Sequence, residues 1–416
     1  MPHSSNSDEP EAERRRWAVQ MFRDGHSADQ IAEQFQRSRR WVYRWVAYQR
    51  QHPHTRFRPA SRAPRHHPNQ TSRLITHRIV QLRETLQHQR NSRLRYAPIG
   101  ARTIQRELVK RRVNPCPSLS TIQRTLRRHG LTQPTLAEAP YRYRPHPVAD
   151  YPDAVQATDI ITRWLEGGAV VQTFTTVDHF SNAAHATAHA HKHTAAARQH
   201  LLDTWQTLGL PDLAQFDNES AFSGGRHPHR LSPVVRLCLY LGCQVLFIPE
   251  YEADYNWEIE SFNNLWAHQF WSKHYFTTRG RIPLPLRRCL YWHNTDYVAP
   301  RQTDTPAQMR RGYRVYRLPK AWAERIPEDL PLCAGFVHTI RCVAENGQVT
   351  FLNETFPVGK RYHGQYVQLT LDTAAQTLTV YYQAQIAGEW QTLKVFPYPL
   401  DEPVQPVLEQ FKRLHV

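Results

Sequence analysis

The chain has few of the features that fix a fold covalently or carry it into a membrane. Its six cysteines are scattered over 416 residues and form no Cys-x-x-Cys pair, which argues against a zinc ribbon or a disulfide framework and for a reducing compartment. No apolar run approaches the roughly 20 residues of a membrane helix, and the N-terminus lacks a signal-peptide pattern. We therefore expect a cytoplasmic protein with no membrane contact.

Lysine is nearly absent from the first third of the chain. Up to position 150 there are 29 Lys and Arg, of which 28 are Arg, against 11 Asp and Glu, whereas the remaining residues carry 24 against 25. The planar guanidinium group of Arg donates several hydrogen bonds to phosphate and to guanine. This distribution predicts double-stranded DNA as a partner. A solvated, partly disordered basic arm is the alternative, and it fits residues 56–65.

Residues 11–52 predict a helix-turn-helix module of three helices. Gly25 ends the first helix, and Ser27 and Ser38 are placed to cap the second and the third. The apolar positions of the first helix are Trp17, Val19, Met21 and Phe22, and those of the third are Trp41, Val42, Trp45 and Val46. The side chains expected to face DNA are Arg39, Arg40, Tyr43 and Arg44. The alternative is an ordinary three-helix bundle with a charged surface.

Residues 73–133 repeat this pattern and predict a second helix-turn-helix module, which Gly130 closes. The side chains of its third helix that are expected to face DNA are Gln123, Arg124, Arg127 and Arg128. The basic, Pro-rich stretches at 53–72 and 134–152 are predicted to be linkers. Two tandem modules read a longer DNA site than one module does.

From residue 153 onward, strand patterns replace the purely helical ones. The first three strand patterns cover 154–162, 169–177 and 184–191. Helix and strand then alternate, ending in a long helix over 255–271. Three strands followed by this alternation predict a mixed sheet with helices on its faces, and we assign it to residues 153–305.

The end of the chain is rich in β-strand patterns. After a connector at 306–334, residues 335–400 predict a small β-barrel, with a hairpin turn at 345–347 and another at 372–375. The expected fold is therefore multidomain, with all-α helix-turn-helix modules, a central α/β sheet and a C-terminal small all-β barrel.

Three acidic residues occupy positions that require compensation. Asp159 lies within the first predicted strand, Asp217 directly follows the fourth, and Glu260 lies in the first turns of the long helix. An acid in a buried strand is costly without a cation, and no Lys or Arg is equally placed. Taken singly, these residues also fit an edge-strand acid, a turn-forming Asp and an exposed helix acid.

Three converging carboxylates predict a metal site. Oxygen ligands select hard ions, so we expect Mg²⁺, with Mn²⁺ as a substitute. Two ions roughly 3.5–4 Å apart catalyse an in-line phosphoryl displacement. In this interpretation Asp159 bridges the two ions, Asp217 holds one and Glu260 holds the other.

The sequence contexts of the three acids are Ala157-Thr158-Asp159-Ile160, Phe216-Asp217-Asn218-Glu219-Ser220 and Asn256-Trp257-Glu258-Ile259-Glu260-Ser261-Phe262. With these motifs, residues 154–300 resemble the catalytic core of retroviral integrases and insertion-sequence transposases. The chain departs from that pattern at Glu219 and Trp257, which stand where glycines are common. The spacing from Asp217 to Glu260 is also longer than is common in that family, and the extra residues are expected at 223–229.

The resemblance implies a ribonuclease-H-like fold with a DDE triad, and hence a transposase or integrase. Such a polynucleotidyl transferase cleaves transposon ends and transfers the strand into target DNA, as a homo-oligomer on DNA associated with the nucleoid. Two alternatives stay open. One is a domesticated, catalytically inactive, site-specific DNA-binding protein, and the other is a ribonuclease-H-like nuclease without joining activity.

Other residues near the triad have two interpretations each. Asn218, Asn256 and Asn263 are candidates for contacting phosphate or supporting an acid, against roles in a turn, a helix cap or the surface. Glu258 is the rival of Glu260.

The histidines that suggest zinc by ligand type, against an ordinary polar strand edge, are His185, His189, His191 and His193. The aromatic residues that suggest base stacking, against core packing, are Trp41, Tyr43, Trp45, Trp266, Trp271 and Tyr275.

Overall fold

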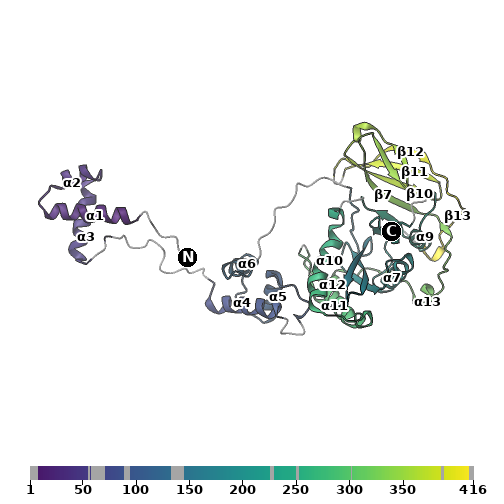
Figure 1. Cartoon of the computed structure of the whole chain (residues 1–416), viewed down its shortest axis with the longest axis horizontal. Helices are drawn as coiled ribbons and strands as arrows, with labels where there is room; N and C mark the ends of the chain where they lie inside the picture. Colours follow the sequence, from purple (N-terminus) through teal and green to yellow (C-terminus); the bar gives the residue numbers. More distant parts are fainter. Residues whose placement is uncertain are drawn as a thin grey trace. The chain divides into compact units, whose positions relative to one another are not determined.

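The fold is taken from a computed structural model, which describes residues 8–54, 57, 71–88, 94–132, 145–224, 229–249, 253–300, 302–385 and 388–411. The chain separates into two compact units, residues 1–70 and 71–416. Figure 1 shows helices alone in the first unit and a large sheet with helices in the second.

The first unit is the predicted three-helix module. Its helices are α1 (Asp8–Arg23), α2 (Ala28–Gln34) and α3 (Arg39–Gln51). Both predicted caps are present: Ser27 Oγ accepts from the Gln30 backbone N–H at 3.3 Å, and Ser38 Oγ accepts from that of Trp41 at 3.3 Å. The Gln30 side chain also accepts from the Ser27 backbone N–H at 3.0 Å, which completes a capping box.

The packing of this module follows the predicted stripe on α3, and on α1 it does so for Val19, Met21 and Phe22 but not for Trp17. Val42, Trp45 and Val46 are buried as expected. Trp17, predicted to lie inside, is 63% exposed, and its neighbour Ala18 is fully buried instead. A small side chain at the helix contact lets α1 approach α3 closely, and this rotates the bulky indole of Trp17 to the outside.

Three further helices open the second unit: α4 (Arg73–Gln87), α5 (Ala101–Lys110) and α6 (Leu119–Arg128). Ser72 and Ser118 cap α4 and α6, and Gly130, with φ at +68°, follows α6. Their shared core contains Ile79, Leu82, Leu86, Ile104, Leu108, Ile122 and Leu126. The predicted linker at 53–72 lies largely outside the described residues. Of the linker at 134–152, residues 145–152 are described, and there the Pro145 carbonyl accepts a hydrogen bond from the Tyr255 hydroxyl.

The predicted mixed sheet is confirmed. Its first five strands are β1 (Val155–Trp164), β2 (Val170–Asp178), β3 (Ala184–His189), β4 (Leu213–Phe216) and β5 (Gln244–Phe247). Strand β2 pairs antiparallel with β1 and β3, whereas β4 pairs parallel with β1 and with β5. The order β5-β4-β1-β2-β3 therefore puts β1 and β4 side by side in the interior of the sheet.

Helices cover both faces of this sheet (Figure 1). Helices α7 (Thr194–Thr207), α8 (Ser220–Ser223) and α9 (Pro233–Tyr240) share a core with the β2 and β4 side chains Phe174 and Phe216. On the other face, α10 (Trp257–Gln269) and α11 (Pro283–Asp296) share a core with Ala157 and Val171. Short 3₁₀ turns lie at Ala253–Asn256, Trp271–Lys273, Arg279–Arg281, Lys360–Tyr362 and Glu409–Phe411.

The C-terminal region is β-rich, as predicted, but its strands do not form a free-standing barrel. It contains β6 (Leu332–Cys333), β7 (Phe336–Cys342), β8 (Gln348–Phe351), β9 (Glu354–Pro357), β10 (Tyr366–Asp372), β11 (Thr377–Tyr382), β12 (Gln391–Pro397) and β13 (Val404–Gln405). Strand β7 pairs parallel with β5, so the order β12-β11-β10-β7 continues the central sheet. Pairing with β7 covers the edge of β5, which would otherwise expose unpaired backbone groups. A single apolar core runs through both regions.

The first predicted hairpin turn has a different role in the structure. Residues 345–347 connect β7 to β8, but β8 pairs with β9, around Leu352 and Asn353. Strand β7 pairs with β10 on one side and with β5 over Val337–Thr339 on the other, and at the turn itself the Ala344 N–H donates to the Gln348 carbonyl at 2.9 Å. The second predicted hairpin, β10–β11, is confirmed with Asp372 opposite Thr377.

The connector is anchored by a buried arginine. It contains α12 (Pro306–Met309), which Thr305 caps, and α13 (Lys320–Ala323). Arg310 Nη2 lies 2.7 Å from Asp153 Oδ2, and its Nη1 lies 3.1 Å from Asp178 Oδ2. The same Nη2 donates to the Leu208 carbonyl at 2.7 Å. The connector is therefore fixed to the sheet by an ion pair away from water.

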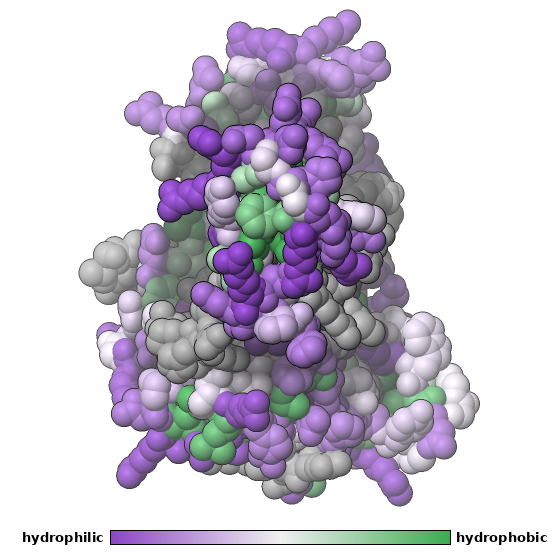
Figure 2. All heavy atoms as spheres, turned by 90° about the vertical axis from the view of Figure 1, so that its left-hand side faces the viewer, coloured by the Kyte–Doolittle hydropathy of each residue, from purple (hydrophilic) through white to green (hydrophobic). Residues whose placement is uncertain are grey.

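The visible surface in Figure 2 is predominantly hydrophilic, with apolar side chains exposed in small patches. No described helix has both the length and the apolar character needed to cross a membrane.

We predict that Arg310→Met lowers the free energy of unfolding by about 3–5 kcal/mol at pH 7.5, because it leaves two buried carboxylates without their cation. Burial and the charge of Asp153 raise the pKa of Asp178 to about 6, from an ordinary 3.8. Native Asp178 is largely protonated below pH 6, where the ion pair with Arg310 is lost in the unsubstituted protein too, so the loss grows as the pH rises through 6 toward 7.5 and is small at pH 5. Urea unfolding across this range measures it.

Arg317→Met is the matched control, since Arg317 donates to the Thr207 carbonyl at an exposed position and pairs with no buried acid. A change within about 0.5 kcal/mol is expected there. Equal losses for the two variants, or a loss for Arg310→Met that is the same at every pH, would contradict the role assigned to this ion pair.

Candidate active site

Asp159 lies in the interior of the sheet and is bonded to the helix above it. Its Oδ1 accepts from the Ile160 backbone N–H at 2.7 Å, and its Oδ2 accepts from Asn263 Nδ2 at 2.6 Å. Asn263 Oδ1 accepts in turn from Thr175 Oγ1 on β2 at 2.9 Å. The asparagine amide therefore joins α10 to two neighbouring strands.

Asp217 reaches the same level of the sheet from β4. The parallel register pairs Thr158 with Phe216, so the next residue on each strand is one of the two acids. Because side chains alternate along a strand, Asp217 lies on the same face as Gln215, which donates to Asn256 Oδ1 at the start of α10 at 2.8 Å. One oxygen of Asp217 accepts from the Glu219 backbone N–H at 3.1 Å.

Glu260 belongs to the same group through its place on α10. It lies three residues before Asn263, so both side chains leave the helix on one face. Its charge raises the pKa of Asp159. Asp159 therefore interacts electrostatically with both Asp217 and Glu260, and Asn263 is bonded to it.

The electrostatics of the site disfavour its negative charge. Burial is the largest cause that raises the pKa of Asp159 to about 6, opposed by the bonds from Ile160 and Asn263. Burial likewise raises the pKa of Asp217 to about 6, reinforced by the charges of Asp159 and Glu219. A cation bound among these carboxylates would remove the penalty.

Glu219, which the sequence analysis singled out as a departure within the motif of Asp217, and Lys192, which it did not consider, both act on this site. Lys192 Nζ lies 2.8 Å from Glu219 Oε2, and the bonds from Lys192 and Ser220 lower the pKa of Glu219. Lys192 also lowers the pKa of Asp217. The acid that follows Asn218 in this turn is therefore paired with a partly exposed lysine.

Glu258, the rival of Glu260, contacts a different residue. Its Oε1 lies 3.9 Å from His179 Nδ1. Burial lowers the pKa of His179 to about 3, so the imidazole is neutral and the contact is not an ion pair. Glu258 therefore contacts His179, whereas the charge of Glu260 acts on Asp159.

Of the four histidines considered for zinc, His189 belongs to a hydrogen-bonded network with Thr187 and His200. Thr187 Oγ1 lies 2.8 Å from both His189 Nε2 and His200 Nδ1, and burial lowers the pKa of His200 well below its usual range. The rings of His191 and His193 stack with their centroids 4.9 Å apart. In the described part of the chain, no three His, Cys, Asp or Glu side chains lie in a preformed metal cage. The fit of Mg²⁺ to the three acids rests on their hard oxygen donors and their concentrated charge.

The side chains expected to face DNA lie on the surface of their helices. On α3, Arg39, Arg40, Tyr43 and Arg44 are exposed, and on α6, Gln123, Arg124, Arg127 and Arg128 are exposed. The α4–α6 module also contacts the segments that follow α10 and end α11. Arg95 donates to the Lys273 carbonyl at 3.1 Å, and Arg106 donates to that of Asp296 at 2.8 Å.

Most of the aromatic residues considered for base stacking are wholly or partly buried. Trp45 and Trp266 are buried, and Trp41 and Trp271 are half-buried, so packing accounts for these rings. Tyr43 and Tyr275 are exposed, at 54% and 92%.

Comparisons with known proteins give one family assignment, for the first unit. Residues 9–52 match the family model of the homeodomain-like domain. No curated protein matches the chain.

Among solved structures, the HTLV-2 integrase catalytic core in complex with magnesium is 14% identical, covering 39% of this chain and 99% of its own, with a TM-score of 0.31. An intasome of simian T-cell lymphotropic virus is 15% identical, covering 72% and 96%, with a TM-score of 0.36. The catalytic core of BIV integrase is 14% identical, covering 38% and 92%, with a TM-score of 0.28. These likenesses are too weak to identify a function.

We predict that Asp217→Asn stabilises the metal-free protein at pH 7.5 by about 1–3 kcal/mol. The amide oxygen keeps the bond from Glu219, and the variant removes a buried charge whose pKa is about 6, against 3.8 ordinarily. A raised acid pKa destabilises the native state increasingly as the pH rises from 4 to 6, so the gain disappears below pH 4. Thermal unfolding of both proteins at several pH values checks this.

If Asp217 is a metal ligand, the same experiment with added Mg²⁺ reverses which of the two proteins is the more stable. Mg²⁺ then raises the Tm of the unsubstituted protein at pH 7.5, less so at pH 5 where protons compete, and leaves that of Asp217→Asn nearly unchanged. An equal Mg²⁺ shift in both proteins would show that the ion binds elsewhere.

Proposed function

We propose that this chain is a DDE-type DNA transposase, which cleaves the ends of a DNA element and joins them to target DNA. One observation carries the proposal: Asp159 and Asp217 occupy the same level of adjacent parallel strands, with Glu260 of α10 acting on the same site. Both aspartates have pKa values raised by burial, and few cations are nearby. Perturbed, converging carboxylates of this kind are typical of functional sites.

In the proposed site, Asp159 would hold two Mg²⁺ ions, and Asp217 and Glu260 would hold one each, with Mn²⁺ as a substitute. When bound, the ions supply activation of the attacking hydroxyl and neutralisation of the leaving oxygen. Asn263 donates to Asp159 and so orients its carboxylate, as partners of metal ligands do. Lys192, which pairs with Glu219 beside Asp217, would also contact a phosphate group of the bound DNA.

The reaction has two steps at this one site. Water attacks a phosphodiester bond at the end of the element, which frees a 3′-hydroxyl group. That hydroxyl attacks a phosphodiester bond of the target, so one bond is formed for each bond broken. No covalent intermediate with the protein is required, and no nucleophilic Ser, Cys or Tyr has a role.

The helical modules would supply DNA recognition. The homeodomain-like residues 9–52 expose a row of Arg and Tyr side chains on α3, the helix that enters the major groove in such modules. The α4–α6 module would contact DNA while bonded to the catalytic region. Assembly of several copies on the DNA would bring two ends together.

The test is Mg²⁺-dependent nicking and joining of a labelled DNA that carries the sequence flanking the gene. We expect Glu260→Gln to reduce both products by at least about 100-fold, since it removes a metal ligand without changing the shape of the side chain. Glu258→Gln is the matched control, two residues away on the same helix, and is expected to stay within a few-fold of the unsubstituted protein.

The other outcomes separate the alternatives. Nicked DNA without joined products would indicate a ribonuclease-H-like nuclease. Site-specific binding without products from any variant would indicate a DNA-binding protein, with Glu219 and Trp257 as the first residues to restore to glycine. Loss of activity in Glu258→Gln with activity retained in Glu260→Gln would reassign the third ligand.

A further inference from the structure

The C-terminal β region reaches the turn that carries Asp217. Strand β7 pairs with β5 as far as Thr339 opposite Phe247, and then continues past the end of β5. Two residues further on, Arg341 Nη1 donates to the Ile248 carbonyl at 3.2 Å. Arg341 Nη2 donates to Asn218 Oδ1 at 2.9 Å, across 123 positions of sequence.

Arg341 thereby fixes one end of the Asn218 amide, and the other end is fixed as well. Asn218 Nδ2 donates to the Ile248 carbonyl at 2.7 Å, so that carbonyl accepts from Asn218 and Arg341 together. With a donor on its oxygen and an acceptor on its nitrogen, the amide has only one satisfied orientation.

This orientation bears on Asp217 through the backbone. Asn218 is the middle residue of a turn in which the Glu219 N–H donates to Asp217 Oδ1. Ser223 Oγ donates to the Asn218 carbonyl at 3.3 Å and holds the turn from its other side. A rotation of Asn218 would move the Glu219 N–H and with it the Asp217 carboxylate.

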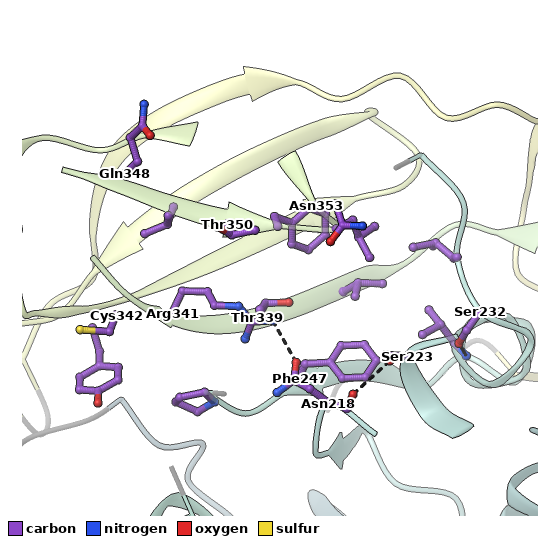
Figure 3. Close-up of a pocket in the computed structure, with 18 of the residues that line it drawn as sticks. Asn218, Ser223, Ser232, Phe247, Thr339, Arg341, Cys342, Gln348, Thr350 and Asn353 are labelled. Atoms are coloured by element: carbon purple, nitrogen blue, oxygen red, sulfur yellow. Dashed lines mark hydrogen bonds between the residues drawn. The ribbon is translucent and has the colours of Figure 1, made fainter. Parts of the chain in front are cut away.

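We propose that Arg341 is a positioning residue for the metal-binding carboxylate of Asp217, acting through the Asn218 amide. The inference rests on the proposed function and deepens it, because it makes the C-terminal β region part of the catalytic site. Arg341 and Asn218 lie on the wall of a cavity of about 420 Å³ between β5, β7 and β8 (Figure 3). Since open space borders the guanidinium, truncating it leaves room for the amide to turn.

The experiment compares Arg341→Ala, Asn218→Ala and the double variant in the full-length protein. Mn²⁺ affinity is measured by calorimetry, and kcat and KM are measured with the labelled DNA end. We expect Arg341→Ala to weaken Mn²⁺ binding and lower kcat by about 10–100-fold, with KM for DNA unchanged. The double variant is expected to be no worse than Asn218→Ala, because both changes remove the same constraint. Arg341→Lys should recover little, since Lys lacks the planar fork that spans two acceptors.

Arg236→Ala is the control for a general loosening of the C-terminal region. Arg236 on α9 also binds this region, through Glu402 and the Leu330 carbonyl at 3.1 Å, but it does not touch the turn at 217–219. We expect a lower Tm and an unchanged Mn²⁺ affinity for this variant.

Two results would overturn the inference. A raised KM with unchanged Mn²⁺ affinity in Arg341→Ala would make Arg341 a DNA contact. Losses that multiply in the double variant would show that Arg341 does not act through Asn218. If the unsubstituted protein and Asp217→Asn bind Mn²⁺ equally, the proposed function fails instead, and this outcome is distinguishable because it does not depend on Arg341.

Discussion

The hydrogen bond from Asn263 Nδ2 to Asp159 Oδ2 sets the position of the long helix over the sheet, and the geometry of the site depends on it. Thr175 on the neighbouring strand holds the other end of the same amide. With α10 fixed in this rotation, Glu260 acts on Asp159 while Glu258 lies against the neutral imidazole of His179. The two glutamates are two residues apart, roughly 200° around the helix, so only a rotation of that size would exchange them.

The acids that converge under α10 are held at an electrostatic cost. Burial raises the pKa of Asp159 and of Asp217. The charges of Glu260 and Glu219 raise the pKa of Asp159 further, and the charges of Asp159 and Glu219 raise that of Asp217. Proteins retain such costly arrangements where function requires them, since Asn or Gln at the same positions would give a more stable fold. A polyanionic substrate would increase the repulsion, so the proposed chemistry requires bound cations at this site rather than merely tolerating them.

The nine-stranded sheet, as far as the structure describes it, connects the C-terminal strands to the turn that carries Asp217. Strand β5 is bonded to β4, which carries Asp217, on one side and to β7, which carries Arg341, on the other. The buried pairs of Arg310 and the continuous apolar core tie the connector and the last strands to the same frame. Only strand β5 therefore separates β7 from the strand that leads into Asp217.

Local patterns determined the helices, their caps and the strands of the sheet. Ser27, Ser38 and Ser118 act on the residues next to them, and alternating apolar residues mark strands wherever they lie in the chain. The same patterns located the three acids, because strand ends and first helical turns are visible in sequence. Tertiary structure decided the rest: that Ala18 and not Trp17 faces the core, that β7 covers β5 instead of starting a separate barrel, and that Arg341 meets Asn218. These depend on which surfaces meet after folding, and the hydrogen bonds and edge pairings involved join residues far apart in the sequence, where no periodicity connects them.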